Sequence, residues 1–507
     1  MMGTINLTAK GFMQELHFTG SNGDVMSQRQ LLAKRIGLVA LTNLLVEANS
    51  LIMLPLLTKN LPVSEYGVWV QITVTIGLVP AVALLGLPYS MVRFLSSAKG
   101  RENIQEIFYS MAAIIALAGL AASVAIYLLA EPIASALFDG RLIIVQYLSI
   151  LVFLECLISI PFTYFRSVQQ IKKYSAFNFA KVFFSLLLVI YFVLSGKGIL
   201  GAVIGLLFAD ILIFLAMISF VVSDVGASFP KFQNIKEHLA FGMPTIPGNL
   251  SSWIVNSSNR YVIGLLMGTT FVGYFSPGYT LGNMINLFIA PLSFILPAAL
   301  SKHYDEHETE EVRTILGFSL KFFLALGIPA AFGLSLLSRP ILSVLSTPEI
   351  AAQGYMVTPF MALGALFLGA YAIVAQIMVL EKNTALTGKI WIIAAILNLV
   401  ISFLLIPYMG IIGGAIATLI SFAFVFIITS YYAKKSIKIS FRLNFIVKSL
   451  VASMVMSFLL LISRPEGVAG LALSVAICAL IYFIVLLVLN GFTKEEIAFI
   501  RTLRYNK

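Results

Sequence analysis

Four side chains near the middle of the chain have the chemistry and spacing of a site for a negatively charged ligand. They lie in "FGMPTIPGNLSSWIVNSSNRYVIGLL" at i, i+4, i+7 and i+11, which is one face of a helix: Asn249, Trp253, Asn256 and Arg260. An arginine presents a fork of N–H donors that suits a carboxylate or a phosphate, asparagines add hydrogen bonds, and the indole adds an aromatic surface. The spacing predicts an anion-binding stripe along one side of a helix.

This helix is predicted to cross a membrane. Of the 507 residues, 60% are hydrophobic and 11% are charged, against about 25% charged in soluble proteins. Apolar runs near the roughly 20 residues that span a bilayer recur along the chain. Polar side chains within such runs must face protein or a water-filled cavity, because lipid cannot satisfy them. We predict an all-α polytopic membrane protein with about fourteen transmembrane helices, near residues 37–58, 67–95, 107–130, 141–165, 175–195, 198–223, 239–266, 270–300, 313–337, 354–379, 384–408, 411–432, 445–463 and 467–490.

The two halves of the chain carry a faint internal repeat. The segment "LIMLPLLTKNLPVSEYGVWVQ" has the same layout as "RYVIGLLMGTTFVGYFSPGYT", with Tyr66 matching Tyr274. We predict two six-helix bundles related by a pseudo-two-fold repeat, with a substrate site between them near mid-membrane. The predicted parts are a cytoplasmic N-terminal tail (1–36), the first bundle (37–223), a cytoplasmic linker (224–238), the second bundle (239–432), two additional helices (433–490) and a cytoplasmic C-terminal tail (491–507).

The basic residues fall in alternate loops. Loops rich in Lys and Arg stay in the cytoplasm, so both termini are predicted to be cytoplasmic. This topology explains the net charge of +11 without nucleic acid as a partner. Cys156 and Cys478 both lie inside apolar runs, which indicates neither a disulfide framework nor a metal site.

Other ionisable residues lie within the predicted spans, where they are costly. The basic ones either line the cavity or extend to the membrane interface: Arg93, Lys181, Lys321 and Lys389. The acidic ones are either structural partners of the basic ones or protonatable groups coupled to a gradient of H⁺ or Na⁺: Glu47, Glu155 and Asp210. The sequence leaves both alternatives open.

Prolines interrupt the second, seventh and eighth predicted spans, which include corresponding spans of the two halves. Each removes a helix hydrogen bond and kinks or breaks the helix: Pro80, Pro88, Pro244, Pro247, Pro291 and Pro297. Bends at matching places suit a gate in alternating access, and static packing kinks are an equal alternative.

Two segments resemble a known family. "FGMPTIPGNLSSWIVNSSNRYVIGLLMGTTFVGYFSP" resembles the seventh-helix region of polysaccharide flippases of the multidrug/oligosaccharidyl-lipid/polysaccharide exporter superfamily, through Gly-x-Pro-x-x-Pro, Trp-x-x-Asn-x-x-x-Arg and Val-Gly-x-Tyr patterns. "LPLLTKNLPVSEYGVW" is similar to that family's first-helix exit. Members often carry an acidic residue before the arginine, where this chain has Asn259. Arg260 must therefore find its partner in ligand, water or another helix.

The resemblance implies a MATE-like fold and an O-antigen type flippase. Such a protein moves a sugar unit on a polyprenyl diphosphate from the cytoplasmic to the outer leaflet, for the biosynthesis of cell-surface polysaccharide such as lipopolysaccharide. It implies that Arg260, with Asn256 and Trp253 beside it, binds the anionic headgroup. We expect a monomer without a cofactor in the cytoplasmic membrane, with lipids and glycan-assembly proteins as partners.

Three other functions compete with this interpretation. A cation-coupled multidrug antiporter of the same superfamily is favoured by Glu47, and no feature excludes a lipid II flippase. A membrane glycosyltransferase or polysaccharide polymerase would need a large loop or an acidic catalytic motif. The acidic loop "HYDEHETEEVR" has neither an Asp-x-Asp nor an HExxH arrangement. We therefore predict a transporter and not an enzyme.

Overall fold

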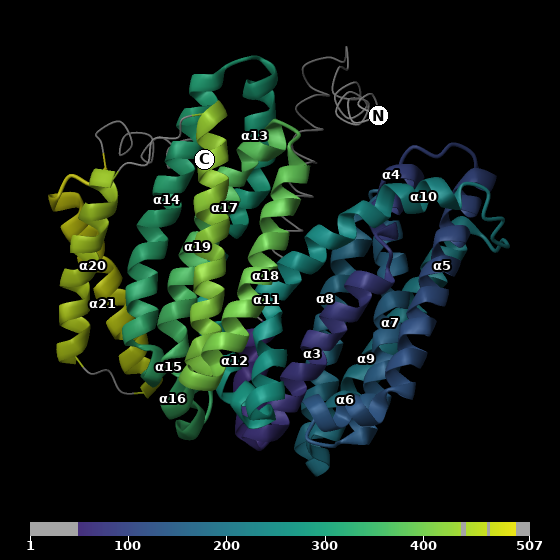
Figure 1. The fold of residues 1–507 in the computed structure, drawn as a ribbon, viewed down its shortest axis with the longest axis horizontal. Coiled ribbons are helices and arrows are strands. Elements are labelled where there is room, and N and C mark those ends of the chain that lie inside the picture. The colour runs from purple at the N-terminus through teal and green to yellow at the C-terminus, as the bar shows by residue number, and fades with distance from the viewer. Residues whose placement is uncertain (1–48, 438–442, 464–466, 493–507) are drawn as a thin grey trace.

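The first part of the chain forms a bundle of long helices. The structure, a computed structural model, describes residues 49–437, 443–463 and 467–492. These ranges contain helices and no strand (Figure 1). The N-terminal bundle consists of helical residues 49–60 and of α3 (Val63–Ala83), α4 (Leu87–Leu95), α5 (Arg101–Leu128), α6 (Ala130–Leu137), α7 (Leu142–Ser167), α8 (Ile171–Phe192) and α9 (Gly198–Val225).

The second part forms another bundle and a separate helix pair. Helix α10 (Ile235–Gly242) packs on α4 and leads into the C-terminal bundle. That bundle consists of α11 (Ile246–Met267), α12 (Thr269–Asn283), α13 (Ala290–Asp305), α14 (Thr309–Leu336), α15 (Ser338–Leu345), α16 (Pro348–Gly354), α17 (Val357–Leu380), α18 (Thr384–Met409) and α19 (Ile411–Ser436). The pair α20 (Leu443–Ser463) and α21 (Gly467–Val488) lies beside α14 at one edge (Figure 1).

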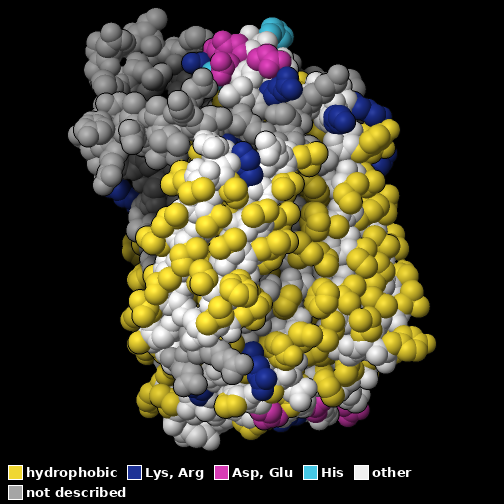
Figure 2. All heavy atoms as spheres, turned by 90° about the vertical axis from the view of Figure 1, so that its left-hand side faces the viewer, with side chains coloured by type: hydrophobic (Ala, Val, Ile, Leu, Met, Phe, Trp, Pro, Cys, Tyr) yellow, Lys and Arg dark blue, Asp and Glu magenta, His cyan; other side chains and the backbone are white. Residues whose placement is uncertain are grey.

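The helices have the length and composition of membrane spans. Ten helices within the described ranges qualify, or eleven if α12 and α13 form one bent span. One qualifying stretch, Ile171–Val225, contains both α8 and α9, which pack together across a turn at Gly196. Figure 2 shows a broad hydrophobic band on the face that carries α20 and α21, with charged side chains mostly near its two ends. The all-α membrane class is confirmed, while the number fourteen and the domain boundaries stay predictions.

Four of the six prolines mark breaks between helices. Pro88 lies in the first turn of α4, after a break where Leu85 and Gly86 have positive φ. Pro244 lies in a 3₁₀ turn and Pro247 in the first turn of α11. Pro291 begins α13, which is bent by 50° from the segment that contains α12. The two others lie inside helices: Pro80 in α3 and Pro297 in α13. Their role in a gate stays a prediction.

The two bundles meet where α3 crosses α12. A methyl group added at Gly67 would lie 1.9 Å from the Thr269 carbonyl oxygen, and one at Gly273 would lie 2.4 Å from the Val63 carbonyl oxygen. The two contacts are exchanged by an offset of 206 residues (273 − 67 and 269 − 63). The contact is therefore itself two-fold symmetric. Its offset of 206 residues is two shorter than the offset of 208 between Tyr66 and Tyr274 (274 − 66).

This crossing lies at the end of the molecule that carries α6, α15 and α16, which we call the closed end (Figure 1). There the Thr269 hydroxyl also donates a hydrogen bond to Asp139 of the N-terminal bundle. Toward the other end, which carries α4, α10 and α13, the helices of the two bundles diverge (Figure 1). The closed end is thus the main place where the bundles are joined.

We predict that Gly67→Ala destabilises the protein by about 1–3 kcal/mol, because the backbones of α3 and α12 must separate to admit a methyl group. Thermal unfolding in detergent would show a lowered Tm. Gly388→Ala is the matched control, since a methyl group at this helical glycine would have no heavy atom within 4 Å beyond its chain neighbours and the nearby backbone of its own helix. Equal Tm values for the two variants would contradict the close contact.

Candidate functional site

A polar cavity of about 690 Å³ lies between the two bundles. Its walls come from residues of the first helix and of α3, α7, α8 and α9 on one side, and of α11 and α12 on the other. The charged residues among its described lining are Glu155, Lys181 and Arg260. Hydroxyl and amide groups surround them: Asn49, Ser50, Thr73, Asn178, Ser185, Ser257, Ser276 and Thr280. Such a lining suits a ligand with both negative charge and many hydroxyl groups.

Arg260 is held in the cavity wall by neutral groups. Its Nη1 donates to the Asn256 carbonyl oxygen at 3.2 Å, and its guanidinium carbon lies 4.0 Å from the centre of the Tyr279 ring. The Tyr279 hydroxyl donates to the same carbonyl at 2.7 Å. Gln71 of α3 donates to the Arg260 carbonyl oxygen at 2.9 Å. No ion pair with Arg260 occurs among the described residues, so its charge is available to an anionic ligand.

The neighbouring Asn259 points away from the cavity into the C-terminal bundle. It is buried, its side-chain Nδ2 donates to the Thr418 hydroxyl of α19, and its side-chain Oδ1 accepts from the Ser402 hydroxyl of α18 at 2.6 Å. Ser258 donates to Asn398 of α18 at 3.2 Å in the same network. Asn259 therefore links α11 to its own bundle. The side chain at this position faces away from Arg260, so having asparagine there in place of an acid does not change the surroundings of Arg260.

Lys181 on the opposite wall belongs to a charged triad. Its Nζ lies 2.6 Å from Glu155 Oε1 and 3.7 Å from Asp210 Oδ1. The three residues come from three successive helices, α7, α8 and α9. Glu155 and Lys181 line the cavity with side chains 20% exposed, whereas Asp210 is fully buried behind them. The structure thus brings one of the predicted basic residues together with two of the predicted acidic residues.

The predicted stripe on α11 reaches the cavity only in part. Trp253 lines it together with Arg260. The side-chain amide of Asn256 instead donates to the Ser252 carbonyl oxygen at 2.8 Å, and Asn256 is not part of the lining. Asn249 is exposed in the first turn of α11, 3.5 Å from the Tyr89 hydroxyl. Asn256 differs from the prediction because its side-chain amide bonds to its own helix. Asn249 differs because the helix break at the prolines lies next to it.

Three other predicted cations lie outside the cavity lining. Lys321 is buried beneath the C-terminal pair, its ammonium 4.9 Å from the ring centre of Phe445 and 5.1 Å from that of Phe492. Lys389 is exposed on α18, and Arg93 lies in the last turn of α4. The position of a residue along an apolar run does not reveal which way its side chain faces around the helix axis. The sequence therefore could not distinguish these three residues from Lys181, which lines the cavity. Glu47 lies outside the described residues.

Sequence reasoning missed two residues that position Arg260. Gln71 is a fully buried amide in the apolar run of α3, and Tyr279 lies in the part of α12 that faces α11. An isolated glutamine inside a span was the available signal, since a buried amide in a membrane helix must have a partner.

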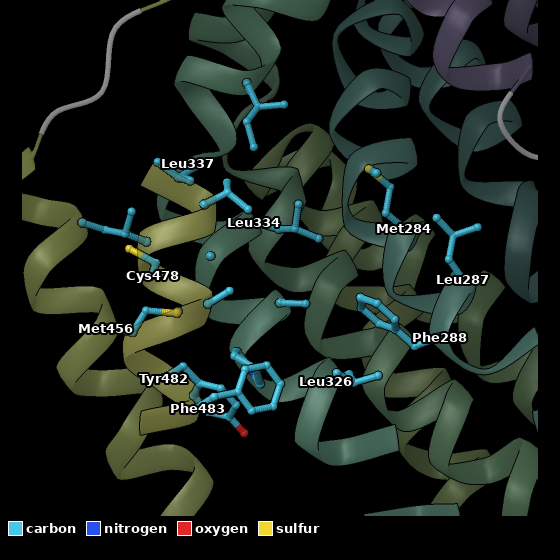
Figure 3. A pocket seen from close by; sticks show the side chains of 17 residues that line it. Met284, Leu287, Phe288, Leu326, Leu334, Leu337, Met456, Cys478, Tyr482 and Phe483 are labelled. Carbon is cyan, nitrogen blue, oxygen red and sulfur yellow. The ribbon is translucent and has the colours of Figure 1, made fainter. Parts of the chain in front are cut away.

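A second cavity is apolar. Its volume is about 310 Å³, and it lies between α14, the turn after α12 and the C-terminal pair. Figure 3 shows Met284, Leu326, Met456 and Phe483 among its walls. No charged residue lines it among those described, so it suits a hydrocarbon group and not a charged ligand.

These features define a polytopic membrane protein of two helical bundles, with a polar cavity between the bundles. The family of polysaccharide biosynthesis proteins matches residues 56–351, and the chain belongs to this family. The resemblance of the first and seventh helices to the polysaccharide branch is thereby confirmed.

Known proteins resemble this chain in sequence or in fold. A probable low-salt glycan biosynthesis flippase of Haloferax volcanii is 20% identical over 228 residues, 45% of this chain and 48% of that protein. The chain thus spans about half the length of this relative. The structure of a lipid II flippase, MurJ, in an inward closed conformation has a TM-score of 0.76 at 18% identity, over 89% of this chain and 98% of that one. An inward-facing multidrug resistance MATE transporter has a TM-score of 0.64 at 13% identity, over 78% of this chain and 97% of that one. These likenesses confirm the MATE-like fold.

We predict that Lys181→Ala lowers the free energy of unfolding by about 3 kcal/mol, because it leaves two carboxylates without their shared cation. Adding Asp210→Asn to Lys181→Ala should restore part of this loss, since it removes the fully buried charge. Chemical or thermal unfolding of the two single variants and the double variant would measure the coupling. Additive effects of the two changes would contradict an electrostatic triad.

Proposed function

We propose that this protein is a flippase that moves an oligosaccharide on a polyprenyl diphosphate across the cytoplasmic membrane for cell-surface polysaccharide biosynthesis. The observation that supports this most is the cavity with one cation on each bundle, Arg260 on α11 and Lys181 on α8. A diphosphate placed between them can accept charge-assisted hydrogen bonds from both. The membership in a polysaccharide biosynthesis family and the glycan flippase among its relatives agree with this substrate class.

The rest of the cavity suits a sugar. Trp253 offers an indole face on the wall that carries Arg260. Hydroxyl and amide groups on α8, α11 and α12 can form the hydrogen bonds that sugar hydroxyls otherwise form with water. The polyprenyl chain needs no polar partner and remains in lipid. The cavity therefore binds the headgroup while the tail stays outside it.

Alternating access explains how the headgroup crosses. The bundles are joined at the closed end and diverge toward the end with α4 and α10 (Figure 1). The loops at that end are rich in Lys and Arg. By the positive-inside rule the diverging end faces the cytoplasm, with both termini on that side. Separation of α3 from α12 would open the other end. We propose that a gradient of H⁺ or Na⁺ acts through Glu155 and Asp210.

A lipid II flippase is the second candidate, because a MurJ structure shares the fold over 89% of this chain. Lipid II is also a polyprenyl diphosphate with sugars, so the same two cations would serve it. The two functions differ in the sugar and not in the anionic group. They are separated only by offering both substrates.

We predict that Arg260→Ala lowers translocation by about tenfold or more, because a charge-assisted hydrogen bond contributes about 1.5–3 kcal/mol. Liposomes containing the protein and a fluorescent polyprenyl-diphosphate oligosaccharide would report it as loss of label protection from a membrane-impermeant quencher. Arg260→Lys should keep part of the activity, because it keeps the charge and loses the guanidinium fork.

Lys389→Ala, which removes an exposed cation outside the cavity lining, is the matched control and should behave like the wild type. Wild-type activity in Arg260→Ala would contradict its role at the headgroup. Transport of lipid II in place of the oligosaccharide would favour the second candidate. Efflux of cationic dyes without lipid transport would point to the antiporter.

A further inference from the structure

We propose that the triad of Glu155, Lys181 and Asp210 takes up one proton when the anionic headgroup binds in the cavity. This inference rests on the proposed function and concerns the same cavity. The ion that accompanies the substrate is then a proton, and the triad couples its uptake to binding. Lys181 is the joining group, because the carboxylates and the headgroup compete for its ammonium.

The triad holds one negative charge more than positive charge when all three groups are ionised. Asp210 is 0% exposed, and neither of its carboxylate oxygens has a hydrogen-bond partner among the described residues. The cation that pairs with it, Lys181 Nζ, is 3.7 Å from Oδ1 and closer to Glu155, at 2.6 Å. A buried carboxylate without hydrogen bonds is costly unless it is paired or neutralised. The triad is therefore built to accept one more positive charge.

Among the residues that the structure describes, no other charged group is placed to supply that charge from the helices packed around Asp210. Helix α9 packs on α3, α5, α7 and α8. From α7 and α8 the charged groups that face Asp210 are Glu155 and Lys181. The charged residues of α3 and α5 lie elsewhere. Glu65 pairs with Arg141 at 3.3 Å, and Glu106 accepts from the backbone N–H groups of Lys231 and Gln233. Arg101 donates to the Val225 carbonyl oxygen at the end of α9, and Glu102 is exposed. Arg260 is on the opposite wall, stacked on Tyr279.

Binding of an anion to Lys181 would upset this balance. The ammonium must turn its donors from Glu155 toward the phosphate oxygens, since one ammonium cannot satisfy both groups fully. The carboxylates of Glu155 and Asp210 would then lie together in a poorly hydrated site, and the Lys181 ammonium would compensate less of their negative charge than before. A proton from bulk water restores the balance by forming an O–H bond on one carboxylate oxygen, which we assign to Asp210 because it is the more buried. No oxidant, metal or further reactant is needed.

The consequence is a positive linkage between proton and headgroup. If the complex holds one proton more than the free protein, the affinity for the headgroup falls as the pH rises, by up to about tenfold for each pH unit. Removing either carboxylate removes the excess negative charge. Asp210→Asn and Glu155→Gln should then each bind the headgroup with little dependence on pH, and more tightly than the wild type at high pH.

The test measures binding of N-acetylglucosamine linked to farnesyl diphosphate, a soluble diester in which each phosphate keeps one negative charge across the neutral pH range. Titration calorimetry of the purified full chain, repeated over that pH range and in buffers of different ionisation enthalpy, gives the affinity and the number of protons taken up. Glu155→Gln is measured beside Asp210→Asn, because its side chain is partly exposed and its loss threatens folding less. Glu131→Gln, an exposed carboxylate on α6, is the matched control.

We expect uptake of about one proton in the wild type and the control, and much less in both triad variants. Binding without proton uptake or pH dependence in the wild type would overturn this inference and leave the proposed function intact. Affinity that follows Na⁺ concentration at constant pH would overturn the assignment to a proton. No binding of the headgroup at any pH would contradict the proposed function itself, and this inference with it.

Discussion

The close approach of α3 and α12 is the contact on which the rest of the structure depends. Two glycines allow two backbones to touch, and the contact is symmetric because each half contributes the same kind of element, Val63–Gly67 and Thr269–Gly273. In a membrane there is no hydrophobic drive to bring helices together, so close packing at small residues supplies the adhesion. The cavity lies along the same two helices, so a change at this crossing changes the space between the bundles.

The second constraint is electrostatic, since each charge in an apolar medium must be compensated. The two walls of the cavity meet it differently. On α11, Arg260 is stabilised by an aromatic face and a carbonyl oxygen, and its charge stays available. On the other wall, Lys181 is already engaged by Glu155 and Asp210. A single anionic ligand would thus meet one open cation and one that must be released, which gives the two bundles unequal roles in binding.

Helix α11 connects these two constraints. Its buried face is held to α18 and α19 by neutral amides and hydroxyls around Asn259, so it is tied to the C-terminal bundle. Its other face carries Trp253 and Arg260 and contacts α3 through Gln71. Its polar side chains can remain in the membrane where protein or the cavity satisfies them.

The sequence alone determined the membrane class, the positions of most helices, the duplicated halves and the family, because composition, apolar run length and short motifs are properties of segments. It also identified Arg260 and Trp253 as candidates for the cavity and found Lys181, Glu155 and Asp210 as charges needing a partner. Only the tertiary structure decided that these three belong together, that Lys321 lies beneath another helix pair, and that the amide of Asn256 bonds to its own helix. The physical reason is that rotation about a helix axis and register between helices depend on packing against neighbours far apart in the chain, which no local pattern records.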